Sequence, residues 1–271
     1  MAAGQIIYRK RSGNGMRQGD MARRNWRDEF RVATMFLTRL PVRATGDGLP
    51  ALGGAAWAFP LVGLGVGLAA GVVYGVASWF GLTGWLAAVF AVAAQIALTG
   101  ALHEDGSADV ADGFGGGTDK SAKLAIMRDS RIGAFGVIAL VLSLAARIGV
   151  LAALADTGAV IAALMVSGAA SRAGMAVMMR ALPAARDDGL GHGAGAPDSD
   201  ATMVALVIAV AAALLLLGGG GGLAALIGAA LGALGLASLA RRQIGGQTGD
   251  VLGAGQQTAE VLCLCAIVTV D

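Results

Sequence analysis

The chain has 271 residues, of which 56% are hydrophobic and 14% are charged, and its mean hydropathy is +0.71. An ordinary soluble domain carries roughly 25% charged residues, so this composition excludes a soluble multidomain protein and indicates an integral membrane protein. The formal net charge of +2 is too small to indicate a partner made of nucleic acid.

The N-terminal segment is basic and precedes the first apolar stretch. Its arginines and lysines are not followed directly by an apolar core, so it does not resemble a cleaved signal peptide. We expect residues 1–25 to be a disordered cytoplasmic extension and residues 26–271 to form a single membrane-embedded catalytic domain. Residues 30–40 are amphipathic and end at Pro41, which predicts an interfacial helix rather than a span.

The apolar stretches predict an all-α, polytopic transmembrane bundle. Several runs approach the roughly 20 residues that a spanning helix needs, whereas a barrel would show short alternating segments. The glycines at 218–222 predict a tight turn, which makes residues 202–240 a helical hairpin. A further apolar stretch at 261–270 is short for a span, so we expect six to seven spans. The six predicted spans are residues 52–80, 82–102, 132–155, 157–180, 202–218 and 223–240.

The charged segments between these spans fall on one side of the membrane. If the basic extension is cytoplasmic, as the positive-inside rule predicts, then residues 103–131, 183–201 and 241–260 all face the cytoplasm. The turns on the opposite side are short and nearly neutral. We therefore expect the chemistry to be assembled on the cytoplasmic face.

The most informative motif is an acidic string at residues 103–113, which follows a long uncharged stretch. On a helix, Asp105, Asp109 and Asp112 would fall within an arc of about 60°, one turn above another. Carboxylates at this spacing repel one another, and oxygen ligands favour Mg²⁺ or Mn²⁺ over zinc. The string therefore predicts a divalent cation site, and a solvated loop is the alternative.

Two neighbours of the aspartates are harder to assign. Glu104 points elsewhere on a regular helix, so its place among the metal ligands depends on the local geometry. His103 lies at the end of a span, where a histidine serves either as an interfacial hydrogen-bonding group or in acid–base or metal chemistry.

Arginines mark three further segments. Arg128 and Arg131 lie at the mouth of the third predicted span, where they either bind phosphate or anchor the span by the positive-inside rule. Arg147 and Arg172 lie inside apolar spans, so they should point into the bundle. There each pairs with a carboxylate or backbone carbonyls, or contacts a substrate phosphate.

A glycine-rich turn precedes the last apolar stretch. Gly246, Thr248 and Gly249 offer flexible backbone amides of the kind that cradle phosphates, and Asp250 adds one more carboxylate. A single turn of this kind is weak evidence, but it shares a membrane face with the aspartates.

Taken together, these motifs resemble the cobalamin synthase family. The resemblance covers about residues 30 to 265, in the family's order, and the acidic string and the Gly-Gly-x-Thr-Gly-Asp string together make it specific. The motifs that carry it are Phe36 to Val42, His103 to Gly113, Arg128 to Gly133, Ser171 and Arg172, Arg186 to Gly191, and Gly245 to Gly253.

The resemblance implies a multi-pass enzyme of the bacterial inner membrane with its active site toward the cytoplasm. Such an enzyme is an adenosylcobinamide-GDP ribazoletransferase, which joins adenosylcobinamide-GDP to α-ribazole or its 5′-phosphate, requires Mg²⁺ and releases GMP. The resemblance leaves open whether the chain forms a homo-oligomer.

This chemistry agrees with the residues. A ribazole hydroxyl attacking a pyrophosphate needs neutralisation of charge on the phosphoryl group and on the leaving GMP. We expect Asp105, Asp109 and Asp112 to hold the metal, with Asp250 and Glu104 as further candidates. Arg128, Arg131 and Arg172, with the glycine-rich turn, would contact phosphates. The general base is one of the aspartates or His103.

The chain departs from the family pattern at two places. Ser107 stands where family members usually carry leucine, which removes no ligand, and the basic extension lies outside the pattern.

Two other functions remain as alternatives. One is a membrane CDP-alcohol phosphotransferase, whose acidic string has a different spacing from the one around Asp109. The other is an ion-coupled transporter, in which Arg147 and Arg172 would line a pathway.

Overall fold

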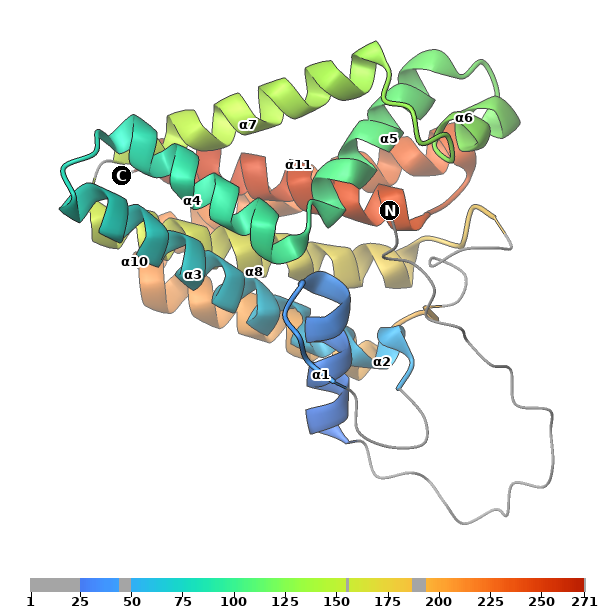
Figure 1. The fold of residues 1–271 in the computed structure, drawn as a ribbon. Helices are drawn as coiled ribbons and strands as arrows, with labels where there is room; N and C mark the ends of the chain where they lie inside the picture. Colours follow the sequence, from blue (N-terminus) through green and yellow to red (C-terminus); the bar gives the residue numbers. More distant parts are fainter. Residues whose placement is uncertain (1–24, 44–49, 155, 187–193, 271) are drawn as a thin grey trace.

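A computed structural model of the chain describes residues 25–43, 50–154, 156–186 and 194–270, and all regular elements in these ranges are helical (Figure 1). The predicted all-α class is therefore confirmed, whereas the basic extension, apart from Asn25, lies outside the described residues. The helices are α1 (Trp26–Leu37), α2 (Leu52–Ala55), η1 (Ala56–Ala58), α3 (Phe59–Trp79), α4 (Gly84–Thr99), α5 (Leu102–Gly116), α6 (Lys120–Ile126), α7 (Ala134–Leu154), α8 (Thr157–Ala181), α10 (Ser199–Ile244) and α11 (Gly249–Val268).

The long helices have the length and composition of membrane spans. Among the described residues, five segments are long and apolar enough to cross a membrane, and α4 with α5 forms a sixth if the two are counted together. A polytopic helical bundle is thus confirmed. The five are Leu52–Trp79, which joins α2, η1 and α3, and the helices α7, α8, α10 and α11.

The second predicted span, residues 82–102, is wrong as a single continuous helix. Helix α4 has 16 residues, or about 24 Å of length, which is less than the roughly 30 Å of hydrocarbon in a bilayer. The chain then bends by 90° into α5. At the bend Gly100 has φ +67°, and a β-carbon there would lie 2.0 Å from Arg39 Nε, so glycine fits both the backbone angle and the space.

The predicted hairpin at residues 202–240 is confirmed within α10. The helical geometry is interrupted at Gly218, where φ is 69° and ψ is −174°. A β-carbon on Gly222 would lie 2.7 Å from the Ala213 carbonyl oxygen. Nine residues of continuous helix would separate these positions by about 13 Å, so the chain folds back on itself. The turn is shorter than predicted, because the glycines after Gly218 are already helical.

The last span begins earlier than the sequence indicated. The apolar stretch at 261–270 is the C-terminal part of α11, which has 20 residues. Residues 249–260 therefore belong to a helix, and their prediction as part of a charged loop is wrong. Polar residues in the first half of α11, including Gln256, Gln257 and Glu260, are buried inside the bundle, which lowered the apparent hydropathy of this half.

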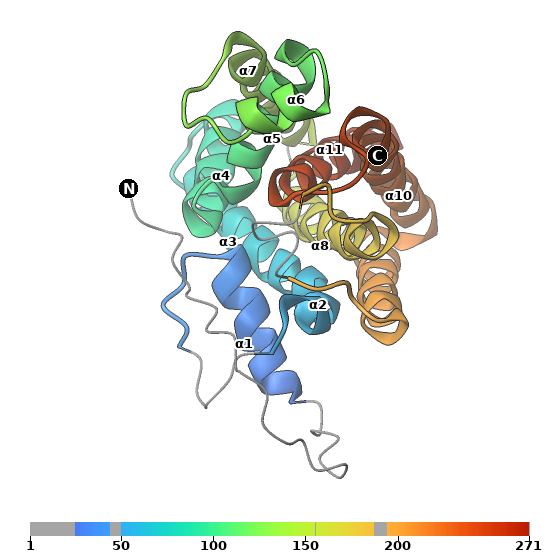
Figure 2. The same ribbon diagram turned by 90° about the vertical axis from the view of Figure 1, so that its right-hand side faces the viewer.

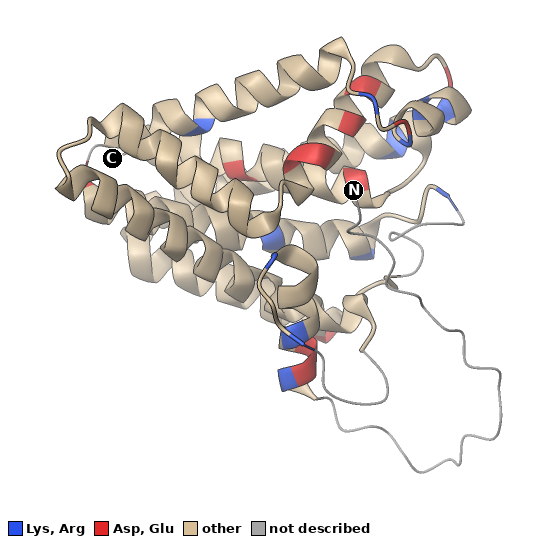
Figure 3. Cartoon of the chain, in the orientation of Figure 1, with Lys and Arg blue, Asp and Glu red and all other residues tan. Residues whose placement is uncertain are grey.

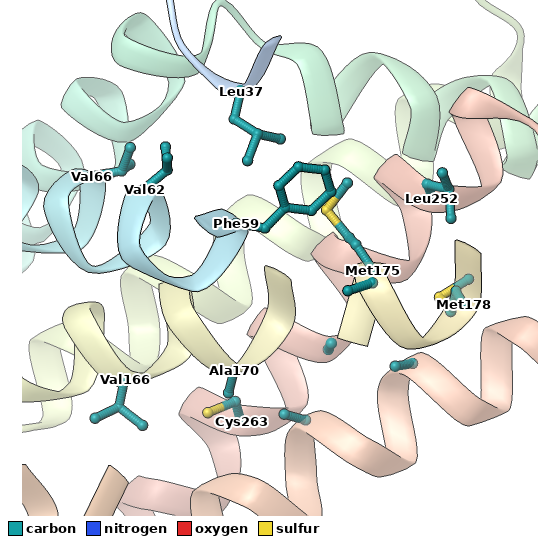
Figure 4. Close-up of a cluster of buried hydrophobic side chains, with 14 of the residues drawn as sticks. Leu37, Phe59, Val62, Val66, Val166, Ala170, Met175, Met178, Leu252 and Cys263 are labelled. Carbon is teal, nitrogen blue, oxygen red and sulfur yellow. The ribbon is translucent and has the colours of Figure 1, made fainter. Parts of the chain in front are cut away.

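The core forms around α8, which packs against α3, α10 and α11 (Figure 2). The α3–α8 contact is close because small residues face each other: β-carbons on Gly63 and Gly67 would lie 2.1 Å and 2.2 Å from backbone carbonyl oxygens of α8. Such small-residue contacts are typical of helix pairs in membranes. Around them the core is filled by side chains such as Phe59, Met175 and Met178 (Figure 4).

Helix α1 lies across the direction of the long helices, outside their bundle (Figure 1). The indole Nε1 of Trp57 donates a hydrogen bond of 2.6 Å to Glu29 Oε2, and the rings of Phe36 and Phe59 stack at 6.5 Å. The predicted amphipathic helix at 30–40 is therefore present with shifted ends, at Trp26–Leu37.

The glycine contact between α3 and α8 predicts a difference between two neighbouring substitutions. Gly67→Ala places a methyl group against the Leu164 carbonyl and should destabilise the protein by about 1–3 kcal/mol, the usual cost of overpacking. Gly65→Ala is the matched control, because nothing lies within 4 Å of its β-carbon position. Melting temperatures of the two purified variants in detergent test this; equal values would contradict the packing.

Candidate functional site

The acidic string forms one helix, as predicted, but its three aspartates differ in exposure. They lie along α5, with Asp105 exposed, Asp109 half-buried and Asp112 buried. Charged residues gather toward the end of the bundle where α5 and α6 lie (Figure 3). The solvated-loop alternative is therefore excluded for this segment.

Helix α11 crosses α5 closely and brings a fourth carboxylate to this helix. A β-carbon on Gly106 would lie 2.8 Å from the Asp250 carbonyl oxygen, and one on Gly253 would lie 3.3 Å from the Cα of His103. The missing side chains allow the two backbones to approach. As a result, Asp105, Asp250 and Asp112 all lie near enough to repel the Asp109 carboxylate electrostatically.

The glycine-rich turn is held against the segment that follows α8. The Ala185 amide donates to the Gln247 carbonyl at 2.9 Å, and the Gln247 amide donates to the Pro183 carbonyl at 2.8 Å. Between them Gly246 lies so close that a β-carbon would be 2.1 Å from the Pro183 oxygen. The turn is therefore packed against this segment, and the amide and carbonyl of Gln247 are engaged there.

This contact introduces an arginine that the sequence-based site did not contain. Arg186 Nη2 lies 3.6 Å from Asp250 Oδ2, next to the carboxylates of α5 and α11. Thr248 donates to the same Asp250 oxygen at 3.1 Å and accepts the Val251 amide at 3.2 Å, which caps α11. Arg186 lies in one of the motifs that resemble the family. Its position beside Asp250 became clear only from the fold, in which backbone hydrogen bonds join Gln247 to Pro183 and Ala185.

Both carboxylate oxygens of Asp112 accept hydrogen bonds from backbone amides at the start of α7. Its Oδ2 accepts a hydrogen bond from the Gly133 amide at 2.7 Å, and its Oδ1 accepts one from the Gly136 amide at 2.8 Å. Gly136 lies in the first turn of α7, and Gly133 directly precedes this helix. The structure therefore gives Asp112 a partner that the sequence did not indicate.

The arginines before α7 lie near the surface. Arg131 is 87% exposed and forms an ion pair of 2.6 Å with Asp129. The hydrogen bond from its side chain, then the one from its backbone amide, lower the pKa of Asp129 to about 2. Arg128 is also exposed. This segment thus presents its charge to water rather than to the bundle interior.

A second polar group lies inside the bundle, and we call it the interior cluster. Arg147 Nη1 and Glu104 Oε1 are 3.1 Å apart, both side chains being almost fully buried. Arg172 donates to the Gly168 carbonyl at 3.1 Å and is attracted by Glu104 and Glu260. The cluster comprises Gln95, Thr99, His103, Glu104, Arg147, Arg172, Gln256, Gln257 and Glu260.

The interior cluster bears on several open alternatives. Arg147 pairs with a carboxylate and Arg172 with a backbone carbonyl, which are the partners that the structural interpretation of both predicted. Glu104 belongs to this cluster rather than to the aspartates. The cluster encloses only about 10 Å³, close to the volume needed by one water molecule. As it stands, this space is smaller than a phosphate group.

Sequence reasoning missed the glutamines and Glu260, although a signal was present. Polar side chains in apolar helices are costly unless they face one another. Gln95 donates to Glu260 at 3.0 Å, and Gln257 donates to Glu104 at 3.2 Å. Since Gln95 and Glu260 are 165 positions apart, their pairing was not visible before folding.

The carboxylates of α5 and α11 supply oxygen atoms, which are the ligands that a hard cation prefers. Within the described part of the chain, no three His, Cys, Asp or Glu side chains are placed so that they could hold one metal ion as they stand. The oxygen donors of Asp105, Asp109 and Asp250 are nevertheless of the type that Mg²⁺ prefers, and a cation would relieve their mutual repulsion. The residues therefore fit the ion by donor type, but not by their present placement.

Comparisons with known proteins identify the family of the chain. The sequence model of the family described as cobalamin-5-phosphate synthase matches residues 29–268, which include all the helices of the site. The chain belongs to this family. Among its relatives are three bacterial proteins named adenosylcobinamide-GDP ribazoletransferase.

The three relatives are similar over nearly their full length. The protein of Bradyrhizobium diazoefficiens is 48% identical over 89% of this chain and 93% of its own. The proteins of Mesorhizobium japonicum and Sinorhizobium medicae are 46% and 44% identical, over 88% and 90% of this chain and 91% and 97% of their own. No solved structure matches the chain.

The buried ion pair of this family member predicts a strong dependence on both partners. Arg147→Leu leaves Glu104 charged and unpaired inside the bundle, which should cost about 3–5 kcal/mol of stability. Adding Glu104→Leu should recover part of that loss. The control Arg131→Leu breaks an exposed pair and should change the melting temperature little. Equal destabilisation by Arg147→Leu and Arg131→Leu would contradict the assignment.

Proposed function

We propose that this chain is an adenosylcobinamide-GDP ribazoletransferase of the late cobalamin pathway. It joins adenosylcobinamide-GDP to α-ribazole or α-ribazole 5′-phosphate and releases GMP. The carrying observation is the convergence of Asp105 and Asp109 from α5 with Asp250 from α11 and Arg186, within a family match of residues 29–268. Acidic and basic groups at one place suit the transfer of a phosphoryl group.

The reaction is a displacement at phosphorus. A ribose hydroxyl oxygen of the acceptor bonds to the phosphorus nearest the corrinoid, the bond from that phosphorus to the bridging oxygen breaks, and GMP leaves with that oxygen. The hydroxyl proton passes to a base. Asp109 is half-buried among other carboxylates, an environment that favours proton uptake, and we assign it as this base. His103 is buried in the interior cluster, away from this role.

Magnesium is the proposed cofactor, with Mn²⁺ as a substitute. Asp105 and Asp250 would hold it, and when bound it would neutralise charge on the diphosphate, while Asp109 beside them would remain available to take the proton. Glu104 and Asp112 are left out of this set because each already has partners elsewhere.

The basic groups divide into two roles. Arg186 lies beside the carboxylates, and Arg128 and Arg131 lie on the exposed segment before α7, so these three are the proposed phosphate contacts. Gly246, Thr248 and Gly249 shape the turn that holds Asp250 in place. Arg172 is only 2% exposed, so we assign it to the interior cluster as a structural cation.

The proposed setting is the bacterial inner membrane with the site toward the cytoplasm. The support is the asymmetry of charge, since many charged residues gather toward the α5–α6 end of the bundle, where the basic residues Lys120, Lys123, Arg128 and Arg131 lie on or after α6. Both substrates are polar and would reach the site from water on that side.

The two alternative functions have less support. Relatives at 44–48% identity carry the ribazoletransferase name, which disfavours a CDP-alcohol phosphotransferase. The interior cluster encloses too little space for a transport pathway. Purified protein should release GMP from adenosylcobinamide-GDP when α-ribazole is added, and release of CMP from a CDP-alcohol instead would reject the proposal.

The carboxylates of Asp105, Asp109 and Asp250 predict that replacing one of them with a neutral residue reduces turnover. Asp109→Asn should reduce GMP release by at least about 100-fold, the scale of losing a general base, while the melting temperature stays near that of the unchanged protein. Asp200→Asn, an exposed aspartate on α10, is the control and should keep full activity. Near-normal turnover in Asp109→Asn would remove that residue from the site.

Removal of divalent cations tests the cofactor separately. EDTA should stop GMP release, and Mg²⁺ or Mn²⁺ added in excess should restore it. Direct binding of Mn²⁺ to the substrate-free protein, followed by electron paramagnetic resonance, should weaken in Asp250→Asn. Full activity after exhaustive EDTA treatment would contradict a metal-dependent reaction.

A further inference from the structure

The buried carboxylate of Asp112 connects two helices that are distant in the sequence. Both of its oxygens accept backbone hydrogen bonds, from Gly133 at 2.7 Å and Gly136 at 2.8 Å. Asp112 is 9% exposed, so these bonds are largely shielded from water. Charge-assisted bonds of this kind are about twice as strong as neutral ones.

The two donors are glycines because the carboxylate lies very close to them. A β-carbon on Gly133 would lie 2.5 Å from Asp112 Oδ1, and one on Gly136 would lie 2.4 Å from Asp112 Oδ2. Real β-carbons do not approach an oxygen this closely, so any other residue would displace the carboxylate. We call the unit of Asp112, Gly133 and Gly136 the Asp112 clasp.

The amides in the clasp need this partner. The first four amides of a helix have no acceptor within the helix, and α7 begins at Ala134. A carboxylate at a helix N-terminus satisfies such amides and interacts favourably with the helix dipole. If Asp112 turned toward a cation with both oxygens, it would leave the buried Gly136 amide without this bond.

The clasp also fixes the segment that carries the exposed arginines. This segment joins α6 to α7. At its start, the buried Met127 packs on α5, where a β-carbon on Gly113 would lie 2.5 Å from Met127 Cγ. At its end, the clasp holds Gly133 to the same helix. Arg128 and Arg131 lie between these two attachment points, so their position relative to the carboxylates of α5 depends on both.

We propose that Asp112 is a positioning residue that holds the Arg128–Arg131 segment against α5, and that it is not a ligand of the catalytic metal. This inference rests on the proposed function for its kinetic consequence. Loss of the clasp should raise the KM for the GDP-activated corrinoid through the arginines, and it should leave the Mg²⁺ requirement unchanged.

Hydrogen–deuterium exchange tests the clasp without turnover. In Asp112→Asn, amides in peptides covering residues 130–140 should exchange at least about tenfold faster, because one charged acceptor is lost. Gly136→Ala should give the same result by displacing the carboxylate. Asp109→Asn and Gly149→Ala are controls that should not change this region, since nothing lies within 4 Å of a β-carbon at Gly149.

Kinetics then separate positioning from metal binding. Asp112→Asn and Gly136→Ala should both raise the KM for adenosylcobinamide-GDP by about tenfold, with the Mg²⁺ concentration for half-maximal activity within about twofold of the unchanged protein. Gly149→Ala should leave both values unchanged. A Mg²⁺ requirement raised in Asp112→Asn but not in Gly136→Ala would overturn the proposal and make Asp112 a ligand.

The two readouts keep this inference separate from the proposed function. Unchanged exchange at residues 130–140 in Asp112→Asn overturns the clasp, whatever the activity. Faster exchange in that variant, together with no GMP release by the unchanged protein, would retain the clasp and reject the ribazoletransferase function.

Discussion

The close approach of α5 and α11 is the constraint on which the site depends. Gly106 and Gly253 allow the two backbones to meet, and without this contact Asp250 would lie apart from Asp105 and Asp109. The approach concentrates negative charge on a half-buried face, which is unfavourable by itself. Arg186 offsets part of this negative charge, and the proposed cation would offset more of it.

The interior cluster holds the start of α5 in a fixed position. Glu104 is adjacent to Asp105 in the chain but faces into the bundle, where Arg147 and Gln257 hold it. Helix α5 is thus attached on one side to buried charges and presents its aspartates on the other. Its far end is fixed to α7 through Asp112. A helix held at both ends can keep acidic groups together despite their repulsion, because moving them would break buried bonds.

Much of the fold follows from local features of the sequence. Apolar length identified most of the spans, the glycines at 218–222 identified the α10 hairpin, and the spacing of Asp105 and Asp109 placed them on one helix. These features depend on neighbouring residues only. The break at Gly100 and the true start of α11 were not identified, because hydropathy does not distinguish a bent helix from a straight one or a buried polar face from a loop.

The sequence by itself determined the helical membrane fold, the acidic helix and the family motifs, since each of these is written in residue type and spacing along a single segment. Only the tertiary structure decided which charged groups share a site. It placed Glu104, Arg147 and Arg172 in the interior, Arg186 beside Asp250, and Asp112 on the amides of α7. The physical reason is that charges pair across helix contacts between segments far apart in the chain, and the order of residues does not specify which faces meet.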